Sequence, residues 1–293
     1  MICELCPRRC RAVRTEEEGR GFCGMPAGLW VARAALHRWE EPVISGTRGS
    51  GAVFFSGCTL RCIYCQNHRI SRENFGRRIT VPQLREIFRT LIAQGAHNIN
   101  LVTPDHFTPW ILEALKEPTG VPIVWNCGGY ERVETLRTLS GRVQIYLPDL
   151  KYADPALAGA LSGAEDYFPT ACAAIEEMVA QTGTPVIENG LMRRGVLIRH
   201  LVLPGQLENT KRCIDWVART FPRGEVLFSL MRQYTPQPGA EGFLARRVRA
   251  GEYRAAAEYL RACGIENGFL QEADSAESTY TPDFDLTGVR LFD

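Results

Sequence analysis

The sequence lacks the features that mark membrane-spanning, secreted and general nucleic-acid-binding proteins. No apolar run approaches the ~18–20 residues that a membrane span needs. The first ten residues, MICELCPRRC, contain no apolar core of a secretory signal, so we expect a soluble, cytoplasmic protein. The 34 basic and 33 acidic residues leave a formal charge of +1, without the basic excess of a polyanion binder. We therefore expect neither a membrane nor a nucleic acid as the main partner.

Lysine is also scarce, because only Lys116, Lys151 and Lys211 contribute to the basic total. A bias in the base composition of the coding DNA accounts for the preference for arginine. Against that background, a lysine weakly marks a site that needs a compact point charge rather than a planar guanidinium.

Cysteine, in contrast, is abundant: there are eleven, and seven of them lie in the first 65 residues. In a reducing compartment such a concentration indicates metal binding or catalysis rather than a disulfide scaffold. The isolated Cys172, Cys213 and Cys263 are expected to be small, buried apolar side chains.

The densest cysteine group is Cys58, Cys62 and Cys65, with the spacing CxxxCxxC. The same spacing is one face of a helix, so a core stripe is the alternative. However, residues 52–55 predict a buried strand that Ser56 and Gly57 end, which places the cysteines in a loop. Zinc sites and electron-transfer clusters usually take four protein ligands, whereas three thiolates would leave one iron of a [4Fe–4S] cluster open.

This spacing after a strand, with Tyr64 before the third cysteine, resembles the signature of the radical S-adenosylmethionine (SAM) enzymes. Residues 49–67 are similar to the opening of the glycyl-radical-enzyme activating enzymes, typified by the pyruvate formate-lyase activating enzyme, although Gln66 replaces their His. The resemblance covers nearly the whole chain and is closest to a branch labelled PflX-like. That branch shares the N-terminal cysteine block, the stretch Trp39–Pro42 and the sequence SGTRGSG.

The N-terminal block contains four further cysteines, which are Cys3, Cys6, Cys10 and Cys23. Pro7 disfavours a continuous helix and nearby glycines mark tight turns. Four thiolates fit a closed structural zinc site, which we prefer for so short a segment, or an auxiliary iron–sulfur cluster that could relay electrons. A nucleic-acid-binding ribbon is the third alternative, because Arg8, Arg9, Arg11 and Arg14 lie among these cysteines.

Six short apolar runs alternate with helical patterns from residue 52 onward, which predicts an α/β protein with a parallel sheet and right-handed crossovers. The predicted strands are 52–55, 98–102, 122–125, 143–147, 196–203 and 225–230, with a short one near 268. Helices are predicted near 82–95, 109–116, 131–139, 168–182, 206–220 and 251–263.

The resemblance implies that this sheet is a partial (β/α)6 radical SAM barrel. We expect a Cys-rich metal-binding segment at residues 1–48, the barrel at 49–236, and a lid and helix extension at 237–293.

Ligands of such sheets bind at the C-terminal ends of the strands. The resemblance implies that the polar residues there contact SAM, and the candidates are Tyr64, Thr103, Asn126, Asp149, Lys151 and Arg199. Thr103 and Asp105 stand where the family has a Gly-Gly-Glu segment, and Asn126 replaces an acid. Arg199 lies inside an apolar strand and needs a partner, either a bound carboxylate or an acid such as Asp149.

The resemblance further implies an enzyme that cleaves SAM reductively at a [4Fe–4S] cluster on Cys58, Cys62 and Cys65. The resulting 5′-deoxyadenosyl radical would abstract hydrogen from a glycine of a protein partner, and a low-potential flavodoxin or ferredoxin would supply the electron. A small molecule or another peptide side chain is the alternative substrate. An iron–sulfur electron carrier or a zinc-binding module is the alternative of another class.

Overall fold

The computed structural model describes residues 2–271 and 282–289. Its elements follow the chain in this order: β1 (Leu29–His37), α1 (Pro42–Ser45), β2 (Ser50–Phe55), α2 (His68–Ser71), β3 (Arg77–Ile79), α3 (Val81–Ala93), β4 (Ile99–Val102), α4 (Thr108–Ala114), β5 (Ile123–Cys127), α5 (Val133–Arg137), β6 (Ile145–Pro148), α6 (Pro155–Ser162), α7 (Tyr167–Thr182), β7 (Val186–Glu188), β8 (Leu191–Leu201), α8 (Leu207–Thr220), β9 (Leu227–Met231), α9 (Ala250–Ala262) and β10 (Gly268–Leu270).

The strands form one mixed sheet in the order β10-β9-β8-β6-β5-β4-β2-β1-β3, with β7 paired to β8. The run from β2 to β10 is parallel throughout, which confirms the α/β prediction and the short last strand near residue 268. β1 pairs antiparallel with β2 and β3, so the sheet takes in residues 29–37, which we had expected in the Cys-rich segment 1–48. The part of the sheet from β2 to β10 thus follows the usual alternation of parallel strands and helices, and β1 and β3 extend it as an antiparallel edge.

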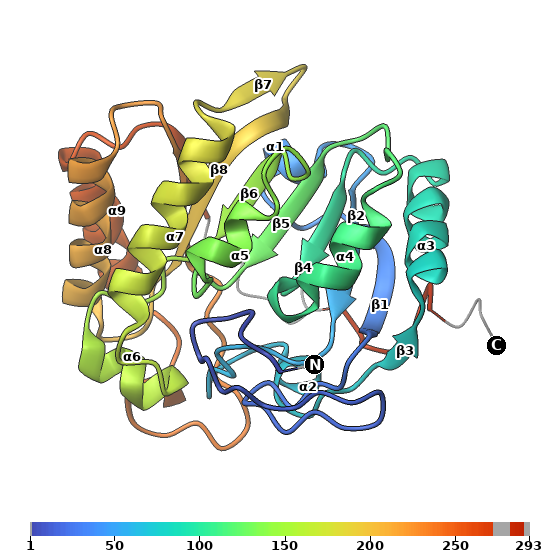
Figure 1. Ribbon diagram of the computed structural model, residues 1–293. Coiled ribbons are helices and arrows are strands. Elements are labelled where there is room, and N and C mark those ends of the chain that lie inside the picture. The colour runs from blue at the N-terminus through green and yellow to red at the C-terminus, as the bar shows by residue number, and fades with distance from the viewer. Residues whose placement is uncertain (1, 272–281, 290–293) are drawn as a thin grey trace.

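The helices lie mainly on the outer, convex face of the curved sheet (Figure 1). Local sequence signals set their ends, as α3 shows. Thr80 caps its N-terminus, Gln83 closes the capping box, and Gly95 adopts a positive φ of 94° just beyond its end. The apolar side chains of α3 face the larger hydrophobic core, which occupies the space between the helices and the sheet.

A smaller apolar cluster fills the opposite, concave face of the sheet. Val43 and Ile44 of α1 pack there against Val124, Ile145 and Leu197 of β5, β6 and β8. The side chains of α1 fill part of the space on the concave face of the sheet. The cavity that remains on this face lies nearer the C-terminal ends of the strands.

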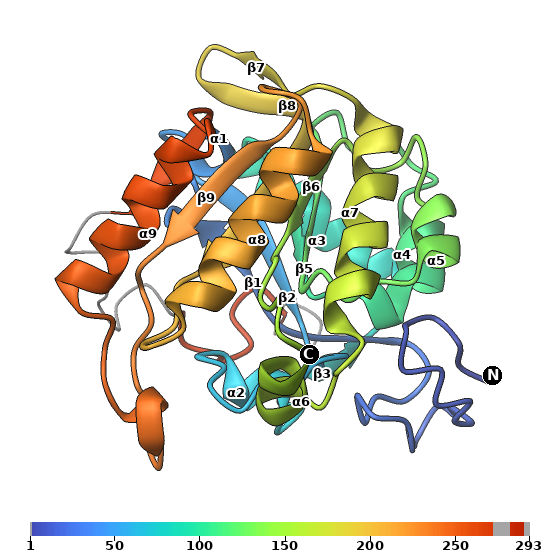
Figure 2. The same cartoon turned by 90° about the vertical axis from the view of Figure 1, so that its left-hand side faces the viewer.

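The N-terminal segment lies at the same end of the molecule as α2 and α6 (Figures 1 and 2). It has little regular structure, and Arg8 connects it to the rest of the chain by donating hydrogen bonds to the carbonyl oxygens of Thr59 and Ser162. In the described part of the chain no helix is both long and apolar enough to span a membrane. The expected lid and helix extension at 237–293 is described only in part, since residues 272–281 and 290–293 lie outside the described residues.

Gly129 tests how tightly the strand-end loops pack. Its φ is +80°, and a Cβ added to it would lie 2.0 Å from the backbone oxygen of Asp149. Gly141 has a similar φ of +74° but nothing within 4 Å of the added Cβ. We predict that Gly129→Ala lowers the free energy of unfolding by ~3 kcal/mol or more, because backbone must move, whereas Gly141→Ala costs ~1 kcal/mol of backbone strain. Urea denaturation of both variants measures this, and equal costs would contradict the described packing.

Candidate functional site

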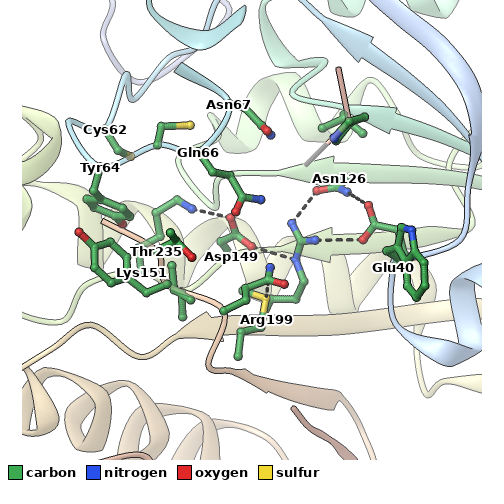
Figure 3. Close-up of a pocket in the computed structure, with 18 of the residues that line it drawn as sticks. Glu40, Cys62, Tyr64, Gln66, Asn67, Asn126, Asp149, Lys151, Arg199 and Thr235 are labelled. Carbon is green, nitrogen blue, oxygen red and sulfur yellow. Dashed lines mark hydrogen bonds and ion pairs between the residues drawn. The ribbon is translucent and has the colours of Figure 1, made fainter. Parts of the chain in front are cut away.

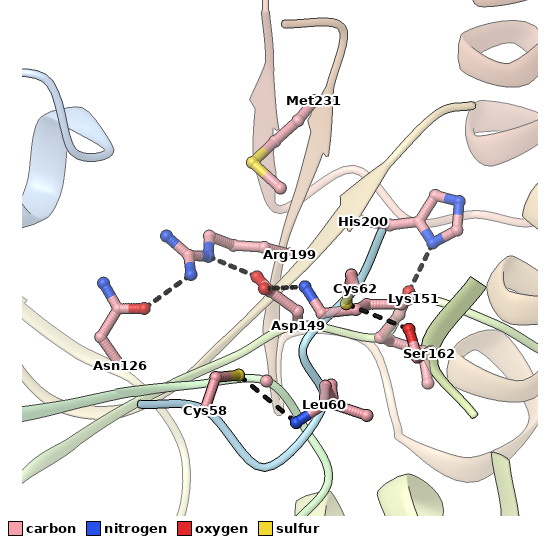
Figure 4. A network of polar contacts seen from close by, with 12 residues as sticks. Cys58, Leu60, Cys62, Asn126, Asp149, Lys151, Ser162, Arg199, His200 and Met231 are labelled. Carbon is pink, nitrogen blue, oxygen red and sulfur yellow. Dashed lines mark hydrogen bonds and ion pairs between the residues drawn. The ribbon is translucent and has the colours of Figure 1, made fainter. Parts of the chain in front are cut away.

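Cys58, Cys62 and Cys65 lie in the loop that leaves the C-terminal end of β2, as the sequence predicts. Cys62 and Cys65 line a cavity at the C-terminal ends of the parallel strands, and Cys58 lies beside them (Figures 3 and 4). The backbone N–H of Leu60 donates to Cys58 Sγ at 3.3 Å, and the Ser162 hydroxyl donates to Cys62 Sγ at 3.0 Å. The helix-face alternative is excluded, because residues 58–65 are not helical.

These three sulfurs fit an iron–sulfur cluster better than a single ion. In the described part of the chain, the three sulfurs do not all lie within 4.8 Å of one another. A tetrahedral zinc site, in contrast, brings its sulfurs to ~3.8 Å from one another. Burial, and then the neighbouring Cys62, raise the pKa of the Cys58 thiol to about 12, so the free thiol stays protonated. A bound metal reverses that preference, and the donors already aimed at Cys58 and Cys62 would stabilise the metal-bound thiolates.

A buried network of charges forms the opposite wall of the cavity, with Arg199 of β8 at its centre (Figure 3). The Arg199 guanidinium contacts Asp149 Oδ1 at 2.9 Å and Glu40 Oε2 at 3.2 Å, and it donates to Asn126 Oδ1 at 2.6 Å. Lys151 donates to the second oxygen of Asp149. The partner that the sequence requires for Arg199 is therefore an acid pair, and a bound carboxylate is not needed to satisfy its charge.

The electrostatics of this network favour the charged forms of Asp149, Lys151 and Arg199. Burial disfavours the Asp149 carboxylate, but Arg199 and Lys151 outweigh that cost and hold the pKa of Asp149 below its ordinary value. Burial raises the pKa of Glu40, although Arg199 and the amide of Asn100 act in the opposite direction. The cavity therefore presents two cations and two acids in a desolvated setting, where each contact is stronger than it would be in water.

Tyr64 and Thr103 differ in their relation to the cavity. Tyr64 is buried, lines the cavity and accepts a hydrogen bond from the Tyr152 hydroxyl at 2.8 Å. Thr103 does not line it; its backbone N–H donates to the carbonyl of Asn126, and its φ of +57° is a strained value for a β-branched residue. Asp105 is turned away, because its carboxylate accepts from the Trp125 indole at 3.1 Å. A contact between the Thr103 side chain and SAM therefore has no support in this geometry.

Several cavity residues were not among the sequence candidates. His37 ends β1, and Trp39 and Glu40 follow it, while Met231, Gln233 and Thr235 come from the end of β9 and the residues after it. Trp39 and Glu40 belong to the stretch Trp39–Pro42 that is shared with the PflX-like branch, but a pattern in the chain could not show that they face the cysteines.

A second polar cluster lies outside the cavity and consists of Asp105, Cys127 and Glu131. Their ligand atoms lie within 4.8 Å of one another, and all three side chains are buried. Burial, and then the charge of Asp105, raise the pKa of Glu131 well above its ordinary value, which favours its protonated form. The protonated Glu131 can donate to Asp105 and accept from the Cys127 thiol, which satisfies oxygens that have no other partner among the described residues.

The four N-terminal cysteines come together, with Cys3, Cys6 and Cys23 buried and Cys10 exposed. Of the three later cysteines, Cys213 is buried as predicted, whereas Cys172 and Cys263 are only half-buried.

Comparisons with known proteins agree with this geometry. The family model described as the radical SAM superfamily matches residues 52–217. An uncharacterized protein of Methanocaldococcus jannaschii is 30% identical over 271 residues, which cover 87% of this chain and 73% of that protein.

Two solved structures share the fold at low sequence identity. HydG, a maturase of the [FeFe]-hydrogenase, superposes with a TM-score of 0.52 at 13% identity, covering 76% of this chain and 52% of that one. Streptococcus suis SuiB bound to S-adenosylmethionine superposes with a TM-score of 0.50 at 10% identity, covering 74% and 49%. The chain thus spans about half the length of these two proteins, and at such identities the likeness shows the fold alone.

Asp149 is the anion on which both buried cations depend. We predict that Asp149→Asn lowers the free energy of unfolding by ~3–5 kcal/mol, because it leaves Lys151 buried without its carboxylate. Glu134→Gln is the matched control, since it breaks an exposed ion pair with Arg132 and should leave the free energy of unfolding nearly unchanged. Chemical denaturation at neutral pH compares the two variants, and equal losses would contradict a desolvated network.

Proposed function

The chain belongs to the radical SAM superfamily, and from this premise we propose a reaction and a substrate class. The proposal is an enzyme that cleaves SAM reductively at a [4Fe–4S] cluster on Cys58, Cys62 and Cys65 and then abstracts a hydrogen atom from a glycine of a protein partner. When bound, the cluster and SAM together supply a 5′-deoxyadenosyl radical, and the protein supplies binding, orientation and exclusion of water.

One observation carries the proposal: the cysteine loop and the buried charge network face the same cavity. Cys62, Cys65, Asp149, Lys151 and Arg199 all line it. The methionyl part of SAM carries one carboxylate and one amino group, which the open iron of the cluster would bind. The cations of the cavity can pair with that carboxylate, and its acids can accept hydrogen bonds from that amino group.

The chain's own residues divide this work between them. Lys151 has one carboxylate partner and is the cation best able to take a second, because Arg199 already contacts Asp149, Glu40 and Asn126. The Asp149 carboxylate can accept hydrogen bonds from the ribose hydroxyl groups, and the Asn126 side-chain amide can accept or donate them. Thr103 would contribute only by holding the backbone beside Asn126.

The remainder of the cavity supports a peptide substrate. Gln66, Asn67 and Gln233 line it with primary amides, which offer one donor and one acceptor group each and can match the N–H and C=O groups of a peptide backbone. Trp39 and Phe54 add apolar walls that would limit the size of the group admitted. A glycine, which has no side chain, satisfies both the pairing and the size restriction. A low-potential flavodoxin or ferredoxin is the electron donor in this proposal.

Removal of one cluster cysteine tests the reaction. After anaerobic reconstitution and reduction with dithionite, we predict that the wild type converts SAM to methionine and 5′-deoxyadenosine, whereas Cys62→Ala makes neither above background. Cys172→Ala is the control, because that thiol lies outside both cysteine groups. Liquid chromatography with mass detection measures the products. A reconstituted wild type that never cleaves SAM would overturn the enzyme and favour an electron carrier.

The substrate class is tested by isotope transfer. We predict that a glycine-rich peptide carrying α,α-dideuterated glycine transfers deuterium to 5′-deoxyadenosine, because the abstracted atom comes from the glycine Cα. The same peptide with dideuterated alanine β-carbons is the control. Product formation without deuterium transfer from either peptide would contradict the glycyl target and favour a small-molecule substrate.

A further inference from the structure

The second cysteine set lies against the first, and its position suggests a role in electron delivery. We propose that Cys3, Cys6, Cys10 and Cys23 hold a [4Fe–4S] cluster that passes electrons to the centre at Cys58, Cys62 and Cys65. This proposal departs from the sequence analysis, which preferred a structural zinc ion at these four cysteines. The inference rests on the proposed function for its electron acceptor, but not for the identity of the metal.

The four thiols converge although they span 21 residues of irregular chain. Burial raises the pKa of Cys6 to about 12, and the nearby Cys23, Cys3 and Cys10 add to that rise while a backbone hydrogen bond at Arg8 opposes it. A Cβ added at Gly21 would lie 3.0 Å from Cys10 Sγ, so the turn that leads to Cys23 also touches Cys10. Four thiols gathered without a disulfide in so irregular a segment form a metal site.

The spacing of the sulfurs favours a cluster over a single ion. Within the described residues, no three of these four sulfurs lie within 4.8 Å of one another. Tetrahedral zinc with Zn–S bonds of ~2.3 Å would bring all four sulfurs to ~3.8 Å. In the described part of the chain Cys58, Cys62 and Cys65, the set that the radical SAM family assigns to iron and sulfur, do not all lie within 4.8 Å of one another either. A cubane is larger than one ion and holds its thiolates farther apart.

The N-terminal segment touches the cysteine loop at three points. A Cβ added at Gly57, the residue before Cys58, would lie 3.2 Å from the carbonyl oxygen of Cys23. Arg61, between Cys58 and Cys62, donates to the carbonyl of Phe22 at 3.0 Å, and Arg8 donates to the carbonyl of Thr59 at 2.8 Å. The chain segments that carry the two cysteine sets are therefore in contact, as a direct relay of electrons between their metals requires.

Burial and exposure give this site an inner and an outer side. The guanidinium of Arg14 is almost fully buried and donates to the carbonyl oxygens of Pro26 and His106. It also points toward Cys3 Sγ at 3.9 Å, so it places positive charge beside the thiolates of a metal centre. Cys10 is exposed on the other side, where an external donor can approach. One electron would pass from a reduced flavodoxin or ferredoxin to this cluster and on to the inner centre. The donor is oxidised by one electron, and the reductive cleavage of SAM consumes that electron.

Metal content and two reductants test the proposal together. The wild type, reconstituted anaerobically, should contain about eight irons per chain without stoichiometric zinc, and Cys10→Ser or Cys23→Ser should contain about four. Loss of the second cluster should also remove one electron paramagnetic resonance signal from the reduced protein. Cys172→Ser is the control and should keep both signals. Because Cys10 is exposed, its replacement should leave the circular dichroism spectrum unchanged.

The rate comparison separates relay from structure. With a flavodoxin and its reductase as donor, Cys10→Ser should form 5′-deoxyadenosine at least ~10-fold more slowly than wild type. Dithionite reaches the inner centre directly, so with dithionite the rates of Cys10→Ser and wild type should agree within ~2-fold. One zinc and four irons per wild-type chain would overturn the cluster. Equal donor-driven rates in wild type and a four-iron variant would overturn the relay. Failure of the wild type to cleave SAM would defeat the proposed function, while the iron count would still decide the metal.

Discussion

The buried guanidinium of Arg199 imposes the constraint on which the site depends. A charge inside a parallel sheet must be neutralised, and the four partners come from separate places: Asn126 at the end of β5, Asp149 after β6, Glu40 after β1 and, through Asp149, Lys151. Satisfying this one side chain therefore aligns the ends of three strands with the segment that precedes α1. The result is a polar wall that faces the cysteine loop across a single cavity.

The sequence predicted the parts of this arrangement that depend on local patterns. Each apolar run from β2 to β9 lies within a few residues of its observed strand, and the cysteine loop follows β2 because Ser56 and Gly57 end the strand. Lys151 is buried and paired with Asp149, whereas Lys116 and Lys211 each pair with a glutamate three residues away at the surface, so the scarcity of lysine does not by itself mark a site. The helix α6 had clear signals that were overlooked, namely the cap Asp154, Pro155 at the first position and Gly163 in the left-handed conformation.

Other features could not be predicted because they depend on tertiary contacts. The strand β1 was not identified, since a bulge between Val31 and Arg33 interrupts its alternation and its partner β2 is antiparallel. β3 and β7 contain three residues each, which is too short for a periodic pattern. Glu40 is 109 positions before Asp149 in the sequence, and only the folded sheet brings both to Arg199. Thr103 shows the opposite case, because the resemblance made it a candidate for contact with SAM, but it is not among the residues that line the cavity.

The central claim is that the loop of Cys58, Cys62 and Cys65 leaves one iron open for SAM. The most direct measurement is electron–nuclear double resonance of the reduced cluster with SAM labelled by ¹⁵N at its amino group and ¹⁷O at its carboxylate. The account predicts magnetic coupling of both labels to the cluster, retained in Cys10→Ser and absent in Cys62→Ala. A reduced cluster that has SAM bound nearby but shows no magnetic coupling to either label would contradict the claim that SAM binds the open iron.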